Sequence, residues 1–313
     1  MRNKEALISV IVPCYNEEKG IQFTVDTLTR VLGCGGLKYE LIFVNDGSKD
    51  ATFSIIMACA QKDSRIKGIS FSRNFGKEAA MLAGLQYAQG ECAVIIDSDL
   101  QHPPEKILEM YALYQQGFDI VEGIKAERQN ESLTHRIFAK MFYSILDHAL
   151  GVDVKNASDF KLISRRVIDV LRNLPERERF FRGLTFWTGF KMASVTYEVQ
   201  SRHAGITKWS FTKLVAYAIQ NIISFSTLPL HFITWIGAFM IFLGFFFSLR
   251  ALRLYFSGLA AGGITTVVVL ILISSGLILI SLSIIGRYIA SIYNETKARP
   301  QYLIDKMVGV DEN

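Results

Sequence analysis

Two long stretches near the C-terminal end of this chain contain no charged residue, and they constrain its structure more than any other feature. They are residues 232–249, a run of 18, and residues 264–286, a run of 23. A helix needs roughly 20 apolar residues to cross the hydrocarbon core of a bilayer. Two buried helices of a soluble core are the alternative, but such long helices usually carry some polar residues. We therefore predict two membrane-spanning helices.

The basic residues around these stretches predict their orientation, because Lys and Arg are enriched in cytoplasmic loops. Only Arg250 and Arg253 lie between the two stretches. Six basic residues lie on their outer sides: Lys208, Lys213, Arg287, Lys297, Arg299 and Lys306. The count places both termini in the cytoplasm.

The change in composition divides the chain into four segments. Residues 1–210 mix charged and apolar residues and are predicted to form a cytoplasmic domain. Residues 211–230 have apolar residues at helical spacing, which predicts a juxtamembrane amphipathic helix in the membrane interface; a helix packed on the cytoplasmic domain is the alternative. Residues 231–290 hold the two spans, and residues 291–313 are a cytoplasmic tail.

Short apolar runs alternate with amphipathic stretches in the first hundred residues. The predicted strands are residues 7–12, 39–44, 66–71 and 92–96, and the predicted helices are residues 21–32, 51–61 and 77–88. Continuous apolar strands separated by helices are typical of a parallel sheet covered on both faces, which is an α/β fold. Ligands of such sheets bind beyond the carboxyl ends of the strands, so the residues after each strand are the functional candidates.

Acidic turns follow three of these strands. Residues 13–18 (PCYNEE) follow the first strand, residues 45–48 (NDGS) the second and residues 97–99 (DSD) the fourth. None contains the Gly-x-Gly-x-x-Gly pattern of a dinucleotide site. A single Asp-x-Asp is often a solvated turn. Three acidic turns at strand ends instead indicate a site for Mg²⁺, which binds one or two carboxylates together with phosphate oxygens.

The charge balance limits the partners of the chain. The net charge is +5 and the basic residues are spread along the sequence. This argues against nucleic acid as a partner and suits anionic lipid or phosphate.

Longer motifs extend beyond the acidic turns. They are residues 13–17, 45–48, 73–77 (RNFGK), 97–104 (DSDLQHPP), 158–164 (SDFKLIS), 180–184 (FFRGL) and 202–210 (RHAGITKWS). Together they closely resemble the family 2 glycosyltransferases, which implies a GT-A (Rossmann-like) catalytic domain. With the two spans, the chain resembles the polyprenyl-phosphate branch of that family, within it the bactoprenol (undecaprenyl-phosphate) glucosyltransferases, and more distantly dolichol-phosphate mannose synthase. The resemblance covers residues 8 to 297.

The resemblance implies a nucleotide-sugar site at the strand ends. Its residues are Pro13, Tyr15, Asn16, Glu17, Asp46, Asp97, Ser98, Gln101 and Lys208. Pro13, Tyr15 and Glu17 are expected to hold the base and ribose, and Asp46 to contact the uracil or ribose. The alternatives are a packing aromatic for Tyr15 and a turn-forming residue for Asp46.

The resemblance also implies a metal and a catalytic group. Asp97 and Asp99 match the metal-binding pair, whose Mg²⁺ or Mn²⁺ bridges the diphosphate and neutralises the charge on the leaving group. Asp99, Asp159 and Arg202 are the expected catalytic residues, with Asp159 at the position of a candidate base. A lipid monophosphate has a second pKa of about 6 and is largely dianionic at neutral pH, so it needs little help from a base. Asp159 as an organiser of the acceptor stays open.

Cations are needed because the lipid phosphate and the nucleotide diphosphate repel each other. The expected lipid-phosphate ligands are Arg182, Arg202 and Lys208. Arg179 flanks the same motif, but a basic residue at the membrane edge explains it equally well.

The resemblance implies inverting transfer of a hexose, glucose from UDP-glucose, to undecaprenyl phosphate at the cytoplasmic face of the bacterial inner (plasma) membrane. A transferase with another donor, such as GDP-mannose, and a non-catalytic scaffold that partners a flippase are the alternatives. Small residues in the second apolar run, such as Ser275, Gly276 and Gly286, permit close contact between helices. We therefore predict a homo-oligomer, a tetramer.

Overall fold

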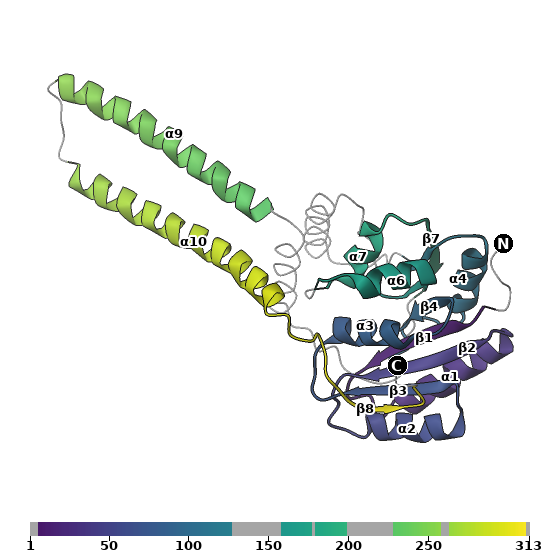
Figure 1. Ribbon diagram of the computed structural model, residues 1–313. Coiled ribbons are helices and arrows are strands. Elements are labelled where there is room, and N and C mark those ends of the chain that lie inside the picture. Colours follow the sequence, from purple (N-terminus) through teal and green to yellow (C-terminus); the bar gives the residue numbers. More distant parts are fainter. Residues whose placement is uncertain (1–5, 127–157, 177–178, 199–227, 258–262, 311–313) are drawn as a thin grey trace. The chain divides into compact units, whose positions relative to one another are not determined.

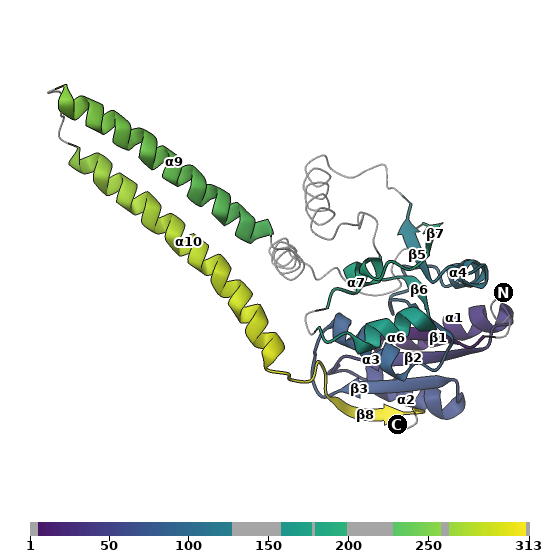
Figure 2. The same cartoon turned by 45° about the horizontal axis from the view of Figure 1, so that its top comes forward.

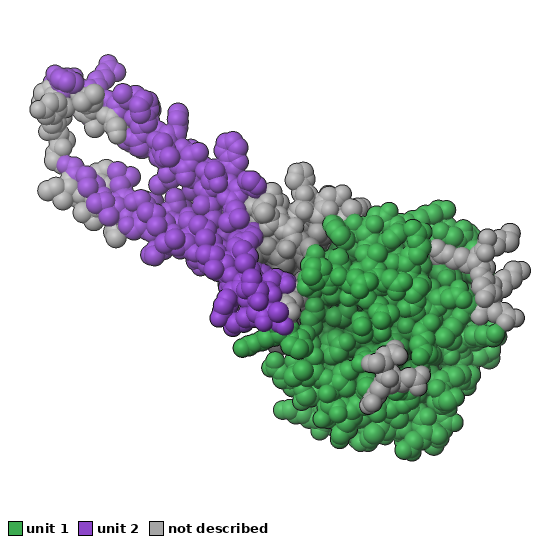
Figure 3. Space-filling model, viewed as in Figure 1, with its two compact units in different colours: residues 1–209, 299–313 green, residues 210–298 purple. Residues whose placement is uncertain are grey.

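The chain divides into two compact units in the computed structural model, which describes residues 6–126, 158–176, 179–198, 228–257 and 263–310. The first unit comprises residues 1–209 and 299–313, and the second comprises residues 210–298 (Figure 3). Each unit is described by itself below.

The first unit is built on one mixed sheet with the strand order β7-β5-β6-β4-β1-β2-β3-β8 (Figure 1). Its strands are β1 (Ile8–Cys14), β2 (Tyr39–Asn45), β3 (Ile66–Phe71), β4 (Cys92–Ile95), β5 (Ile120–Lys125), β6 (Lys161–Ser164), β7 (Met192–Tyr197) and β8 (Ile304–Val308). The four predicted strands are confirmed, and β1 to β4 pair in parallel. The whole sheet is mixed because β6 runs antiparallel to β4 and β5, and β8 antiparallel to β3.

Helices cover both faces of this sheet. They are α1 (Ile21–Cys34), α2 (Thr52–Lys62), α3 (Lys77–Tyr87), α4 (Lys106–Gln115), α6 (Arg165–Asn173) and α7 (Phe181–Trp187). Val10 and Val12 of β1 pack in one core cluster with residues of α1, α2 and α4. Ile11 points to the opposite face, where α3 lies so close that a side chain at Gly84 would come within 2.3 Å of it. The predicted α/β fold is confirmed.

The C-terminal segment adds an edge strand that the sequence analysis did not predict. In β8, Met307 pairs with Ile69 and Lys306 with Ser70 of β3. Just before β8, the Tyr302 ring stacks on Phe71 with 4.9 Å between the ring centroids. Residues 304–308, which lie within the predicted cytoplasmic tail, are therefore part of the sheet.

The second unit holds two long helices, α9 (Leu228–Phe256) and α10 (Ile264–Thr296), which lie side by side in both views (Figures 1 and 2). Both are long and apolar enough to cross a membrane, and large apolar side chains along them are exposed. Residues 228–230 already belong to α9. The rest of the predicted juxtamembrane helix, residues 211–227, lies outside the described residues.

Candidate active site

The carboxyl ends of β1, β2 and β4 meet at one edge of the sheet, because these three strands are parallel neighbours in it. This arrangement brings together the three acidic turns that the sequence places after the strands. Pro13 lies within β1 and is buried, while the Tyr15 side chain after it is 40% exposed. The exposed ring is available to stack on a ligand, whereas Pro13 shapes the strand end.

The turns after β1 and β2 are joined by hydrogen bonds. The Asn16 N–H donates to Ser48 Oγ (2.8 Å), and Asn16 Oδ1 accepts from the Lys49 N–H (2.9 Å). The Glu17 N–H donates to Thr52 Oγ1 (2.8 Å). Asn16 has a φ of 54°, a left-handed conformation that Asn tolerates better than most residues. The two turns therefore form one unit at the end of the sheet.

Asp46 holds the loop that precedes α3. Its buried carboxylate accepts hydrogen bonds from the N–H groups of Phe75 (2.6 Å) and Gly76 (3.0 Å). Burial raises the pKa of Asp46, and the two backbone bonds oppose that rise. Gly47 has a φ of 64°, and a side chain there would come within 2.3 Å of the Arg73 carbonyl carbon. Asp46 thus has a structural role as well as the predicted contact with the nucleotide.

Asp97 and Asp99 follow β4 and are both partly exposed. Asp97 Oδ1 lies 2.5 Å from Lys77 Nζ, and its Oδ2 lies 3.6 Å from His102 Nε2. Burial alone would raise the pKa of Asp97, but the Lys77 ammonium and the His102 ring outweigh it, and the pKa lies well below its usual range. Asp99 Oδ1 accepts from the Gln101 N–H (3.1 Å). Both predicted metal ligands and Gln101 therefore share one turn.

Ser98 contributes to this turn through its main chain. Its carbonyl oxygen accepts from Thr24 Oγ1 of α1 at 2.7 Å, and the residue is buried. The bond anchors the turn to α1 at Ser98, the residue between Asp97 and Asp99.

Asp159 lies beside this turn because β6 is the antiparallel neighbour of β4. Arg182 of α7 donates to it in a two-pronged pair, from Nε to Oδ1 at 2.7 Å and from an Nη atom to Oδ2 at 2.9 Å. Lys77 Nζ lies 2.8 Å from the same Oδ2. Burial opposes ionisation, but the hydrogen bond from Arg182 and the charge of Lys77 prevail, so the pKa of Asp159 lies well below its usual range.

Lys77 is the residue that the sequence analysis left without a role, although it belongs to the RNFGK motif. Its ammonium bridges Asp97 and Asp159, and these two carboxylates raise its pKa against the effect of burial. The Lys77 and Arg182 side chains are 39% and 36% exposed, whereas that of Asp159 is 10% exposed. The two cations are therefore more accessible to an anionic ligand than the Asp159 carboxylate with which they pair.

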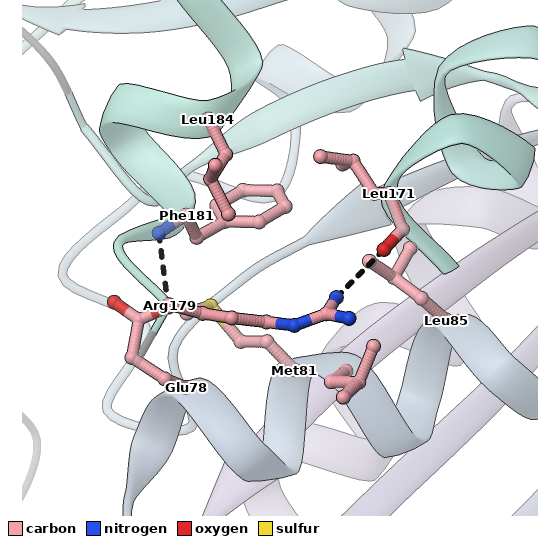
Figure 4. Close-up of a pocket in the computed structure, with 8 residues that line it drawn as sticks. Glu78, Met81, Leu85, Leu171, Arg179, Phe181 and Leu184 are labelled. Carbon is pink, nitrogen blue, oxygen red and sulfur yellow. Dashed lines mark hydrogen bonds between the residues drawn. The ribbon is translucent and has the colours of Figure 1, made fainter. Parts of the chain in front are cut away.

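Glu78, the neighbour of Lys77, was also missed. Its Oε2 accepts from the Phe181 N–H (3.0 Å) at the start of α7, where the preceding residue supplies no side-chain cap (Figure 4). Burial raises the pKa of Glu78 to about 7, and the charge of Asp159 adds to the rise. Its place in the first turn of a helix after a strand is the signal that could have identified it.

Arg179 has a structural role. Its guanidinium donates to the carbonyl oxygens of Leu171 (2.6 Å), Leu174 (2.6 Å) and Glu176 (2.9 Å) at the C-terminal end of α6. Leu171 and Arg179 line an apolar pocket together with Glu78 and Leu184 (Figure 4). Arg202 and Lys208, the other predicted phosphate ligands, lie outside the described residues.

The residues fit a divalent cation that is shared with a substrate. Within the described ranges, no cluster of three or more acidic, His or Cys side chains is arranged to hold a metal ion alone. Asp97 and Asp99 supply two carboxylates in one turn. This donor set suits Mg²⁺ or Mn²⁺, which completes its coordination with phosphate oxygens and water.

A Rossmann-like sheet with acidic turns at its strand ends and a cluster of cations beside them defines a transferase of the GT-A class. Residues 9–171, more than half of the chain, match the family model for glycosyl transferase family 2. The chain belongs to this family and is a glycosyltransferase.

The chain is similar to full-length relatives in that family. A glycosyltransferase of Synechocystis sp. is 39% identical over 306 residues, which cover 97% of this chain and 96% of the relative. A bactoprenol glucosyl transferase of Shigella phage SfX is 38% identical over 299 residues, 95% of this chain and 98% of the relative. The crystal structure of glucosyl-3-phosphoglycerate synthase from Mycobacterium tuberculosis with Mn²⁺ and UDP-glucose aligns with a TM-score of 0.48 and 21% identity, over 70% of this chain and 77% of that chain.

Proposed function

We propose that this glycosyltransferase moves glucose from UDP-glucose to undecaprenyl phosphate at the cytoplasmic face of the bacterial inner membrane. The observation that carries the proposal is the pairing of charges in the site, where Lys77 pairs with Asp97 and Asp159, Arg182 pairs with Asp159, and both cations are more exposed than Asp159. Such an arrangement suits an anionic acceptor that must approach an anionic donor. Relatives named bactoprenol glucosyl transferase, similar over nearly the whole chain, support the choice of acceptor and sugar.

The donor binds at the ends of β1, β2 and β4 in this proposal. Tyr15 packs on the base, Glu17 and Asn16 contact the ribose or base, and Asp46 contacts the nucleotide while it holds the loop before α3. Ser98 and Gln101 lie in the turn that faces the diphosphate. Lys208 is proposed as a further contact.

Asp97 and Asp99 hold a divalent metal ion, Mg²⁺ or Mn²⁺, in the same proposal. Asp97 is ionised at neutral pH and already pairs with a cation, the Lys77 ammonium, so its carboxylate suits a positively charged ligand. When bound, such an ion neutralises the charge that develops on the departing diphosphate.

The acceptor phosphate binds at Arg182, with Arg202 and Lys208 as further proposed ligands. A phosphate oxygen of the acceptor attacks the anomeric carbon of glucose as the bond from that carbon to the nucleotide diphosphate breaks. Attack from the opposite side inverts the anomeric centre, so an α-linked donor gives a β-linked lipid product and free UDP. Asp159 serves as an organiser here, because a carboxylate with a strongly lowered pKa is a weak base.

The helices α9 and α10 anchor the enzyme as two membrane spans with both termini in the cytoplasm. Their length and composition support the two spans, the distribution of basic residues supports the orientation, and the homotetramer stays a prediction from the small residues of α10. The amphipathic helix over residues 211–230 is proposed to lie in the membrane interface.

Transfer of radiolabel tests the proposal. Purified enzyme is incubated with Mg²⁺, undecaprenyl phosphate and labelled UDP-glucose, and in parallel with labelled GDP-mannose. We expect label in the organic phase from UDP-glucose. Label from GDP-mannose alone would assign another donor, and no label from either nucleotide sugar would contradict the proposal.

A further inference from the structure

A lysine with no solvent exposure lies directly behind the candidate active site. Lys161 begins β6, two residues after Asp159. Its ammonium lies 3.0 Å from Glu122 Oε1 and 4.6 Å from the centre of the Phe186 ring, and it donates to Thr185 Oγ1 at 2.7 Å. A buried ion pair of this kind is a weak source of stability, because the loss of hydration opposes the attraction between the charges.

The hydrogen bonds of Lys161 lead to Arg182 in a fixed direction. An ammonium group can only donate, so the Thr185 hydroxyl must accept from Lys161 and is left with one proton to donate. That proton goes to the carbonyl oxygen of Arg182 at 2.9 Å. The main chain of Arg182, the residue that pairs with Asp159, is therefore bonded to a buried hydroxyl.

Glu122 connects Lys161 to the main chain around Asp159, the partner of Arg182. Its Oε1 accepts from the Ser158 N–H (2.9 Å), and Ser158 Oγ accepts from the Phe160 N–H (3.0 Å). These two bonds hold the main chain on both sides of Asp159. Lys161 thus connects to both Asp159 and Arg182 through buried contacts.

We propose that Thr185, whose hydroxyl accepts from the buried Lys161, is a positioning residue that sets the placement of Arg182 against Asp159 and so the binding of the polyprenyl phosphate. This inference rests on the proposed function, since it assigns Arg182 and Asp159 to the acceptor. The base and ribose of the donor are proposed to bind at the turns after β1 and β2, away from Thr185, whereas Asp97 after β4 is joined to Asp159 through Lys77.

The replacement Thr185→Val tests the proposal, because it removes the hydroxyl and keeps the shape of the side chain. We expect kcat/KM for undecaprenyl phosphate to fall about tenfold, with the Kd for UDP unchanged. Thr185→Ser keeps the hydroxyl and should restore the wild-type values. Thr188→Val is the matched control, since Thr188 caps the C-terminal end of the same helix and its hydroxyl donates to the Thr185 carbonyl oxygen (2.7 Å).

Combination with Arg182→Gln separates positioning from general loosening of the fold. If Thr185 acts through Arg182, adding Thr185→Val to Arg182→Gln should cause no further loss of kcat/KM. Independent, multiplying losses would overturn the proposal, as would equal values for Thr185→Val and Thr188→Val. If Thr185→Val does not fold, Thr185→Ala is measured in the same way. If the wild type is active and the losses multiply or the two Thr→Val variants are equal, this inference alone is contradicted. A wild type that glucosylates no polyprenyl phosphate contradicts the proposed function and this inference together.

Discussion

Asp159 receives three charge-assisted contacts, two from Arg182 and one from Lys77, and these contacts set its chemistry. The lowered pKa of Asp159 keeps the carboxylate ionised at neutral and mildly acidic pH. With the proposed lipid-phosphate acceptor, the group whose protonation limits the reaction at acidic pH is then the acceptor phosphate, with a second pKa of about 6.

The first prediction follows from that assignment. Asp159→Asn should reduce the rate by about 100-fold or more, because Arg182 and Lys77 lose the carboxylate that joins them, yet the acidic limb of the rate profile should remain at a pH of about 6. The measurement is the initial rate against pH at saturating UDP-glucose and subsaturating lipid phosphate. Disappearance of the limb in the variant would restore Asp159 as a general base, and wild-type rates would remove it from the site.

The second prediction concerns Asp97 and Asp99. Asp97→Asn or Asp99→Asn should each lower turnover by at least about 100-fold and weaken Mn²⁺ binding measured directly, because each removes one carboxylate ligand. Chelation with EDTA should abolish the wild-type activity. Asp169→Asn is the control, since Asp169 is exposed on α6 and contacts Arg165 only at 3.9 Å. Full activity in the presence of the chelator would refute the metal role.

The third prediction uses the raised pKa of Glu78. An acid that titrates at about 7 in the folded protein and at about 4.3 in the unfolded chain stabilises the fold fully below pH 4. That contribution is lost as the pH rises through about 7, because the folded protein then holds a partly buried charge near Asp159. Glu78→Gln still accepts from the Phe181 N–H and carries no charge, so it should be more stable than the wild type at pH 8 by about 1–3 kcal/mol.

Thermal unfolding of the wild type and of Glu78→Gln at pH 5 and pH 8 measures this effect. The gain in Tm should be larger at pH 8. An equal difference at both values would show that Glu78 does not titrate in this range.

Sequence patterns predicted Asp97 and Asp99 more directly than the other residues of the site. These two follow a strand that a run of apolar residues predicts, whereas Asp159 and Arg182 were identified only through the family motifs that contain them. The contact of Lys77 with Asp159 joins positions 82 residues apart, and that of Arg182 joins positions 23 residues apart. Such contacts depend on the packing of α3 and α7, which no local pattern specifies.

At the scale of whole elements, the N-terminal strands were predictable and β8 was not. The strands β1 and β2 are buried on both faces and give continuous apolar runs. By contrast, β8 is a short, half-exposed edge strand. It pairs with β3, where Gly68 lies opposite Val308 although the two are far apart in the sequence. Its pattern alone does not distinguish a strand from an irregular tail.

The fourth prediction tests the docking of this C-terminal strand. Tyr302→Ala removes the ring that stacks on Phe71 and should lower the free energy of unfolding of the first unit by about 1–3 kcal/mol. Leu303→Ala is the matched control, because the Leu303 side chain is 53% exposed and should contribute less than about 0.5 kcal/mol. Equal stability of the two variants would show that the stacking contact does not hold the strand.

At the scale of the whole molecule, one chain combines a transferase domain with two apolar helices. The strand β8 belongs to the first unit although it follows α10, so the chain returns to its sheet after the second helix. An enzyme built in this way suits one soluble substrate, the nucleotide sugar, and one that stays in the bilayer. The two apolar runs were predictable because they are continuous and free of charge.

The structure of the lipid product tests the central claim most directly. Enzyme, Mg²⁺, UDP-glucose and undecaprenyl phosphate are incubated, and the lipid fraction is analysed by mass spectrometry and by NMR of the anomeric centre. We expect undecaprenyl phosphate carrying a single β-linked glucose, formed together with UDP, and at least about 100-fold less of it from Asp97→Asn. An α-linked product, or a lipid fraction that contains no glucosylated undecaprenyl phosphate, would contradict that claim.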